Sequence, residues 1–206
     1  PYLAEESYSG TDSYVSDDSY GKLDDGEGLN MSGGIDIGIG RFPVNTAEEA
    51  NLMVDKSIDY RFNTPKVLGS WRNSVTLVAD DEDSNTHLNQ VEDQLVPIIQ
   101  SRYPAVNFRK LYLDAYRQVS TTKGHRFPDV NESIGNQIKE GTLLLNFTGH
   151  GGILGWTDEY VLTVPEINSW KNYNKLPLFV TATCEFSSFD NPTEFSAGEL
   201  VLLYEK

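Results

Sequence analysis

The sequence contains one cysteine, few basic residues and no long apolar run. One cysteine in 206 residues excludes an internal disulfide framework and leaves a free thiol, either a small core residue or a reactive nucleophile. Sixteen basic against thirty-one acidic residues give a net charge of −15, so nucleic acid and anionic membranes, which require a basic face, are not expected partners. The sequence shows no signal-peptide pattern, which an excised segment would have lost in any case, and no apolar stretch approaches the roughly 18 residues that span a bilayer.

The sequence contains enough hydrophobic and aromatic residues to build a packed core. Hydrophobic residues make up 38% of the chain and aromatic ones 11%, which fits one large domain or a piece of one. The chain starts at Pro1 without an initiator methionine and stops at Lys206 within a predicted helix. We therefore expect an excised segment of a larger domain.

The N-terminal part, residues 1–34, is acidic and typical of loops. It is rich in Ser, Asp, Gly and Tyr and shows no long apolar period, although Tyr14, Val15 and Tyr20 remain candidate strand residues. The acidic residues at 24–28 are chemically suited to calcium, but their spacing fits no EF-hand loop, and a solvated loop is the favoured interpretation.

From residue 35 to 206, predicted strands and helices alternate, which favours an α/β fold with a mostly parallel sheet and helices on both faces. Strands are predicted over 35–39, 75–79, 108–113, 143–145 and 178–180. Helices are predicted over 46–58, 87–99 with a kink at Pro97, and 130–138, and from 163 and 196 onward, with a loop at 121–125.

A histidine and the only cysteine each follow a predicted buried strand. Residues 143–145 lead to His150 within Gly149-His150-Gly151-Gly152, and residues 178–180 lead to Cys184. If the two strands are parallel neighbours, both side chains lie at the carboxyl edge of the sheet, where open sheets place their ligand sites. This arrangement predicts a Cys-His dyad, because a thiol is a useful nucleophile only when a neighbouring base takes its proton.

Each of these residues has a structural alternative. A cysteine at a strand end is usually a core residue, and a Gly-His-Gly segment can be only a tight turn, but their joint position favours the dyad. The backbone N–H groups of Gly151 and Cys184 are candidates for an oxyanion hole. His87, at a predicted helix start after an acidic loop, and His125, in a polar loop, are expected to have surface or capping roles. The spacing supports no Cys/His zinc site, and neither a metal nor a cofactor is expected.

The third catalytic group and the substrate cleft are less well determined. The carboxylates near predicted sheet edges that are able to orient the imidazole are Asp36, Asp80, Asp158 and Glu185, and spacing does not select among them. The side chains suited to a substrate cleft follow the histidine and the cysteine: Trp156, Tyr160, Glu185, Phe186 and Phe189. For the aromatic ones, packing over the sheet edge is an equal alternative.

Residues 145–152 with Trp156, followed by residues 175–184, resemble the gingipain family of caspase-fold cysteine peptidases. The similarity is greatest to the branch that acts as the sortase of the type IX secretion system, at residues 24–28, 37–43, 182–187 and 196–200. The resemblance covers nearly the whole chain, and the His and Cys motifs are its most specific part.

The resemblance implies a caspase-like fold in which residues 1–206 form a segment of one gingipain-type catalytic domain, with His150 as base and Cys184 as nucleophile. It also implies that Asp36 supports the histidine. The sortase branch acts on proteins that carry a C-terminal secretion signal, alongside other type IX components, at the bacterial outer membrane or cell surface. The alternatives are a catalytically inactive caspase-fold binding module and a truncated inactive fragment.

Overall fold

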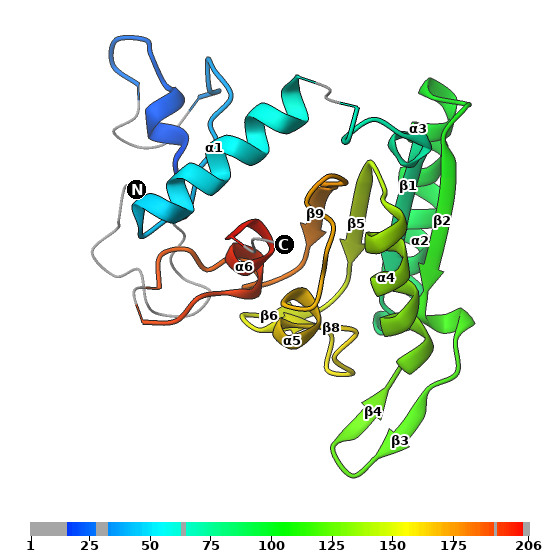
Figure 1. Ribbon diagram of the computed structural model, residues 1–206. Coiled ribbons are helices and arrows are strands. Elements are labelled where there is room, and N and C mark those ends of the chain that lie inside the picture. Colours follow the sequence, from blue (N-terminus) through cyan, green and yellow to red (C-terminus); the bar gives the residue numbers. More distant parts are fainter. Residues whose placement is uncertain (1–15, 28–32, 63–64, 192, 204–206) are drawn as a thin grey trace.

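A four-stranded parallel sheet forms the centre of the computed structural model, which describes residues 16–27, 33–62, 65–191 and 193–203 (Figure 1). The strand order is β2-β1-β5-β9, so the chain crosses over the sheet between successive strands. The bounds are Ser74–Ala79 for β1, Asn107–Tyr112 for β2, Leu144–Thr148 for β5 and Leu178–Ala182 for β9. These strands confirm four of the five that the sequence predicts.

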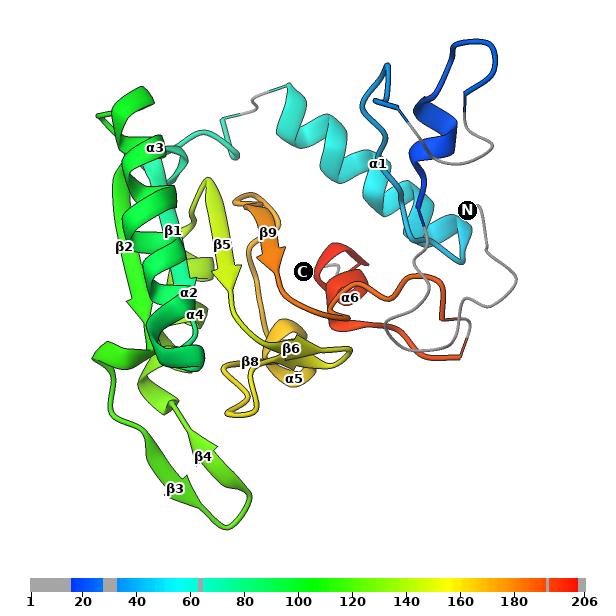
Figure 2. The same cartoon turned by 180° about the vertical axis from the view of Figure 1, so that it is seen from behind.

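Helices cover both faces of this sheet (Figures 1 and 2). Helix α4 (Pro128–Glu140) lies on one face, and the segment from α2 (Thr86–Asn89) to α3 (Val96–Arg102) lies on the other. Side chains alternate along β1, so Val78 joins the core under α4 while Leu77 joins the core under α2 and α3. The predicted mostly parallel sheet with helices on both faces is therefore confirmed.

The kink predicted at Pro97 is a change of helix type. Residues Gln90–Leu95, between α2 and α3, form a π-helical segment that ends two residues before Pro97. Proline has no N–H to donate to the preceding turn, and a wider turn accommodates the missing bond.

Smaller elements pack beside the main sheet. A three-stranded antiparallel sheet follows β5, and within it Trp156 stacks on Phe147 of β5 with ring centroids 4.3 Å apart. Its strands are β6 (Gly151–Gly152), β7 (Gly155–Trp156) and β8 (Leu162–Thr163). The remaining elements are the hairpin of β3 (Val119–Thr121) and β4 (Gly124–Arg126), and the helices α5 (Val164–Ile167) and α6 (Ala197–Leu203).

Capping boxes confirm two of the predicted helix starts. Thr46 and Glu49 form a capping box at α1 (Ala47–Arg61), as do the Thr and Glu that open α5. In α1 the apolar side chain of Val54 is 46% exposed, and the buried side chains are Met53 and Lys56. Lys56 Nζ donates to the carbonyl of a residue in α6, which ties α1 to the end of the chain that the structure describes.

The predicted strand over residues 35–39 is wrong. Residues 36 and 37 form a bend, the other three have no regular secondary structure, and Ile35 and Ile37 are each 48% exposed. Alternation alone makes no strand without a partner strand, and here Asp36 N donates to the carbonyl of Gly21, the last residue of a 3-10 helical turn (Asp18–Gly21). The first strand of the core is β1, well after residue 35, and the loop predicted at 121–125 lies in the β3–β4 hairpin.

Several expectations concern residues outside the described ranges: candidate strand residues Tyr14 and Val15, the end of the acidic run at Gly28, and the helix end at 204–206. Among the described residues, no helix combines the length and the apolar character needed to cross a membrane.

Candidate active site

Three neighbouring strands end at one edge of the sheet and carry the candidate residues. Asp80 directly follows β1, while His150 and Cys184 each lie two residues beyond a register pair, Thr148 of β5 and Ala182 of β9. Both side chains thus follow adjacent parallel strands at their carboxyl ends, as the sequence predicts. Within the described residues no hydrogen bond links the thiol to His150, and what the two residues share is their position at this edge of the sheet.

Close backbone approach explains two of the glycines around His150. A Cβ on Gly149 would lie 2.4 Å from Asp80 Cβ, and a Cβ on Gly151 would lie 2.5 Å from Thr183 Oγ1. No side chain other than hydrogen fits at either position without displacing a neighbour. The His150 segment is therefore held between the loop after β1 and the segment that carries Cys184.

Asp80 anchors this segment through the backbone. Its side chain is fully buried, its Oδ2 accepts a hydrogen bond from His150 N at 2.8 Å, and its Oδ1 accepts one from Asp81 N at 3.0 Å. A buried carboxylate with both oxygens bonded holds its neighbours firmly. Asp80 thus positions His150 without touching its ring.

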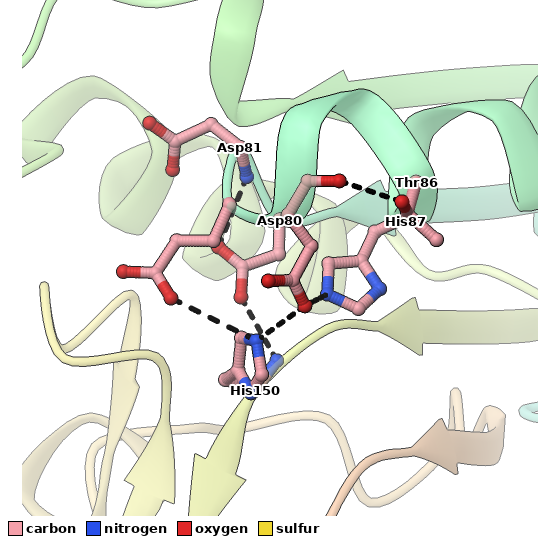
Figure 3. A network of polar contacts seen from close by, with 7 residues as sticks. Asp80, Asp81, Thr86, His87 and His150 are labelled. Atoms are coloured by element: carbon pink, nitrogen blue, oxygen red, sulfur yellow. Dashed lines mark hydrogen bonds and ion pairs between the residues drawn. The ribbon is translucent and has the colours of Figure 1, made fainter.

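The ring of His150 is bonded to a different carboxylate (Figure 3). His150 Nε2 lies 2.9 Å from Asp83 Oδ2, and Glu82 Oε2 is 3.7 Å away. A carboxylate only accepts, so Nε2 carries the proton. The hydrogen bond to Asp83 raises the pKa of His150 above its usual value, the negative charges of Asp83, Asp80 and Glu82 add to this, and partial burial opposes it.

A strained turn brings Asp83 to this position. Asp83, Ser84 and Asn85 have consecutive φ values of 56°, 55° and 66°, the left-handed region that residues other than glycine seldom adopt. Such residues cost on the order of 1 kcal/mol each and concentrate at functional sites. The turn directs Asp83 and the following helix α2 back over His150.

The structure does not place Asp36 at the site. The Asp36 carboxylate accepts a hydrogen bond from Leu23 N at 2.8 Å, and no hydrogen bond or ion pair joins it to His150 in the described part of the chain. The acidic partner of the ring is Asp83, which the sequence reasoning missed. The available signal was the acidic run at 80–83, which directly follows a strand adjacent to that of the histidine.

Two of the five predicted cleft residues belong to the core instead. Trp156 is 0% exposed and Phe186 is 3% exposed, with their rings 5.6 Å apart. The packing alternative therefore describes both side chains. Glu185, next to Cys184, is exposed with a φ of 53°, and Tyr160 is exposed beneath the guanidinium of Arg126.

Cys184 is exposed and forms no disulfide. Its exposure removes the alternative that the thiol is a small core residue and leaves it accessible to a substrate. The oxyanion role of the Gly151 and Cys184 N–H groups stays a prediction.

His87 also reaches the site, so the surface or capping role expected for it is wrong. Its side chain is only 14% exposed, and its ring meets the His150 ring edge-on with centroids 5.2 Å apart. His87 Nε2 lies 3.4 Å from Asp83 Oδ2, yet neither ring nitrogen makes a hydrogen bond. The Asp83 carboxylate is therefore in contact with both imidazoles.

A second acidic cluster lies beside the first. Asp80, Asp81 and Glu159 bring carboxylate oxygens within 4.8 Å of one another, with Asp80 and Glu159 buried. Burial raises the pKa of Asp81 to about 6, and the charges of Glu159, Asp80 and Asp114 contribute to the rise. The site is therefore strongly negative on the side of β1.

Comparisons relate this arrangement to known proteins. The model of Peptidase family C25 matches residues 1–206. The crystal structure of the Arg-specific cysteine proteinase gingipain R (RgpB) has 18% identity and a TM-score of 0.68 over 93% of this chain and 40% of that chain. The complex of Porphyromonas gingivalis RgpB pro- and mature domains has 19% identity and a TM-score of 0.68 over 94% of this chain and 42% of that chain.

A third structure, described only as a protease, has 19% identity and a TM-score of 0.52 over 79% of this chain and 33% of that chain. These likenesses establish a shared fold, and the chain spans about 40% of the length of the gingipain R chain that it matches. A comparison with curated proteins finds no match.

Proposed function

Because the chain belongs to peptidase family C25 and has the caspase-like fold of the gingipains, we propose that it carries the catalytic dyad of a cysteine peptidase. The observation that supports this most strongly is the placement of an exposed Cys184 and of His150, each two residues past the last register pair of adjacent parallel strands. If Cys184 were only a core residue, or the His150 segment only a tight turn, the two residues would have no reason to lie at the same edge of the sheet.

In the proposed reaction, Cys184 Sγ attacks the carbonyl carbon of a peptide while His150 accepts the thiol proton. The C–N bond then breaks, and His150 returns the proton to the departing amine. The resulting thioester between Cys184 and the acyl group is resolved by water or by an acceptor amine. Both steps need His150 to alternate between its neutral and charged forms.

Asp83 prepares His150 for this task. Its bond to Nε2 leaves Nδ1 as the ring nitrogen free to exchange a proton with the thiol, and its charge stabilises the imidazolium. Asp80 fixes the backbone from which the ring projects. The proposed assignment is thus nucleophile Cys184, base His150 and positioning residues Asp83 and Asp80.

We further propose that the protein belongs to the sortase branch of this family, of the PorU type. The support is the resemblance of residues 182–187 and 196–200 to that branch. In this role it removes the C-terminal secretion signal of type IX cargo and transfers the cargo to an anionic lipopolysaccharide, together with other type IX components at the outer membrane or cell surface. Mass spectrometry of cargo incubated with an amine acceptor separates transfer from simple hydrolysis, which yields only the free acid.

Alkylation of Cys184 by iodoacetamide across pH tests the dyad directly. An isolated thiol has a pKa near 8.5, whereas a thiol paired with a catalytic imidazole reacts as thiolate well below that. We expect fast labelling below neutral pH that is lost in His150→Ala, with His125→Ala as the matched control that retains it. Slow labelling independent of His150 would instead indicate an inactive caspase-fold binding module.

A further inference from the structure

Two histidines from separate segments contact the same carboxylate oxygen at the sheet edge. Asp83 Oδ2 lies 2.9 Å from His150 Nε2 and 3.4 Å from His87 Nε2, and the three ligand atoms lie within 4.8 Å of one another. We propose that Asp83, His87 and His150 form a binding site for a divalent transition-metal ion, zinc above all, which withdraws His150 from catalysis when it is bound.

The spacing suits a tetrahedral ion. Zinc binds imidazole nitrogen and carboxylate oxygen at about 2.0–2.2 Å, which places neighbouring ligand atoms about 3.3–3.6 Å apart. Separations of 2.9 and 3.4 Å from a common oxygen need only a small adjustment to reach that geometry. Two imidazoles and one carboxylate also leave a fourth position open for water or another ligand.

The state of His87 is the independent observation that points to a ligand. Both of its ring nitrogens are shielded from solvent and neither makes a hydrogen bond within the described residues, although the ring faces His150 and Asp83 (Figure 3). Buried polar atoms without partners cost free energy. A metal ion between His87 and Asp83 supplies a direct bond to Nε2, which otherwise makes only the 3.4 Å ion-pair contact with Asp83.

The neighbouring acidic cluster has different chemistry. Asp80, Asp81 and Glu159 offer only carboxylate oxygens, a set that suits hard cations. Imidazole nitrogens favour zinc, copper, nickel and cobalt over such cations. The two clusters are therefore distinguishable by the metal they select and by the variants that abolish binding.

Metal binding occupies the imidazole of His150, on which the proposed reaction depends. With its Nε2 bound to a metal, His150 no longer donates to Asp83 and becomes a poorer base toward Cys184. This inhibition rests on the proposed function, whereas metal binding itself depends only on the three side chains. Removal of the metal by a chelator restores the free imidazole, so the block is reversible.

Cobalt(II) titration followed by visible absorption tests the site, because tetrahedral cobalt absorbs far more strongly than the hexaaqua ion. We expect the wild-type protein to develop these bands with one equivalent of cobalt and to lose them when one equivalent of zinc is added. His87→Gln and Asp83→Asn are each expected to weaken zinc binding by more than about tenfold in competition with a chelating dye.

Two variants serve as matched controls. His125→Gln removes an exposed histidine of the β3–β4 hairpin, and Asp81→Asn removes a carboxylate of the neighbouring cluster. Both should bind zinc as the wild type does, and far-UV circular dichroism should show that all variants are folded. If His87→Gln binds zinc with unchanged affinity, the ion is held elsewhere and the proposed site is wrong.

The rate of Cys184 alkylation separates the two proposals. Zinc should slow alkylation in the wild type and leave it unchanged in His87→Gln. If zinc binding depends on His87 but alkylation is independent of His150 even without metal, the metal site stands and the proposed peptidase dyad fails.

Discussion

His150 is held by two carboxylates that act on different parts of the residue. Asp80 bonds to its backbone N–H, and Asp83 bonds to its ring. Separate anchors for backbone and ring define both the position and the orientation of the imidazole, which is what a base needs in order to meet one particular thiol.

Replacement of Asp83 by Asn should lower the pKa of His150, because the imidazolium loses its charged partner. The raised pKa means that His150 stabilises the fold below its unfolded pKa and that this stabilisation disappears as pH rises through the folded pKa. The variant should therefore differ from the wild type mainly at acidic pH. Proposed peptidase activity should fall on the order of tenfold or more.

An NMR titration of the His150 ring protons measures this shift. Glu82→Gln is the matched control, because Glu82 Oε2 lies 3.7 Å from the same nitrogen and forms no hydrogen bond with it. An equal pKa in the wild type and in Asp83→Asn would show that Asp83 does not bond to the ring in solution.

Replacement of Asp80 by Asn should destabilise the protein. Both carboxylate oxygens accept backbone N–H bonds, and an amide presents a donor to one of them, so one buried N–H loses its partner. We expect a loss of about 1–3 kcal/mol in the free energy of unfolding. Urea denaturation measures it, and Asp158→Asn, an exposed site nearby, should change stability by less than about 0.5 kcal/mol.

At the scale of elements, the site depends on strands β1, β5 and β9 ending at one level. Register pairs Ala79 with Thr148 and Thr148 with Ala182, so the segments that follow start side by side. Gly149 lets the segment after β5 pass against Asp80. These segments therefore approach closely for two reasons: the strands end side by side, and Gly149 has no side chain that would keep the segments apart.

Gly149→Ala should therefore destabilise the protein far more than Gly152→Ala. The new methyl group at 149 would lie 2.4 Å from Asp80 Cβ and 2.9 Å from Phe147 Cζ, whereas the one at 152 has no atom within 4 Å. We expect a cost of about 1–3 kcal/mol at position 149. Thermal denaturation of both variants tests this, and equal melting temperatures would contradict the packing described for Gly149.

At the scale of the whole molecule, acidic residues outnumber basic ones, and several of them lie next to the site. The net charge is −15, and the loop after β1 together with Glu159 brings several carboxylates together. Like charges that are partly buried repel one another, so part of the folding free energy offsets this concentration of charge.

Asp81→Asn should stabilise the protein at neutral pH. The folded pKa of Asp81 is raised to about 6, so the folded state prefers the protonated form, and stability is lost as pH rises from the unfolded pKa through about 6. We expect a gain of about 1–2 kcal/mol at pH 8 that vanishes by pH 4. Urea denaturation at both pH values measures this gain in the free energy of unfolding. A gain that does not depend on pH would exclude the raised pKa of Asp81 as its cause.

The sequence by itself determined the elements whose signals are local. Periodicity located β1, β2, β5 and β9, and caps such as Thr46 with Glu49 located helix starts. It also placed His150 and Cys184 each at the end of a strand, and the structure shows that these two strands are parallel neighbours.

Only the tertiary structure decided which side chains meet at that edge. Asp83 lies far from His150 in sequence and reaches it through three left-handed residues that no periodicity indicates. Asp36, with its alternating isoleucines, lies in a loop because no partner strand pairs with it, and Trp156 is buried because the small sheet after β5 folds it onto Phe147. Contacts between distant residues depend on loop dihedrals and packing, which a local pattern does not encode.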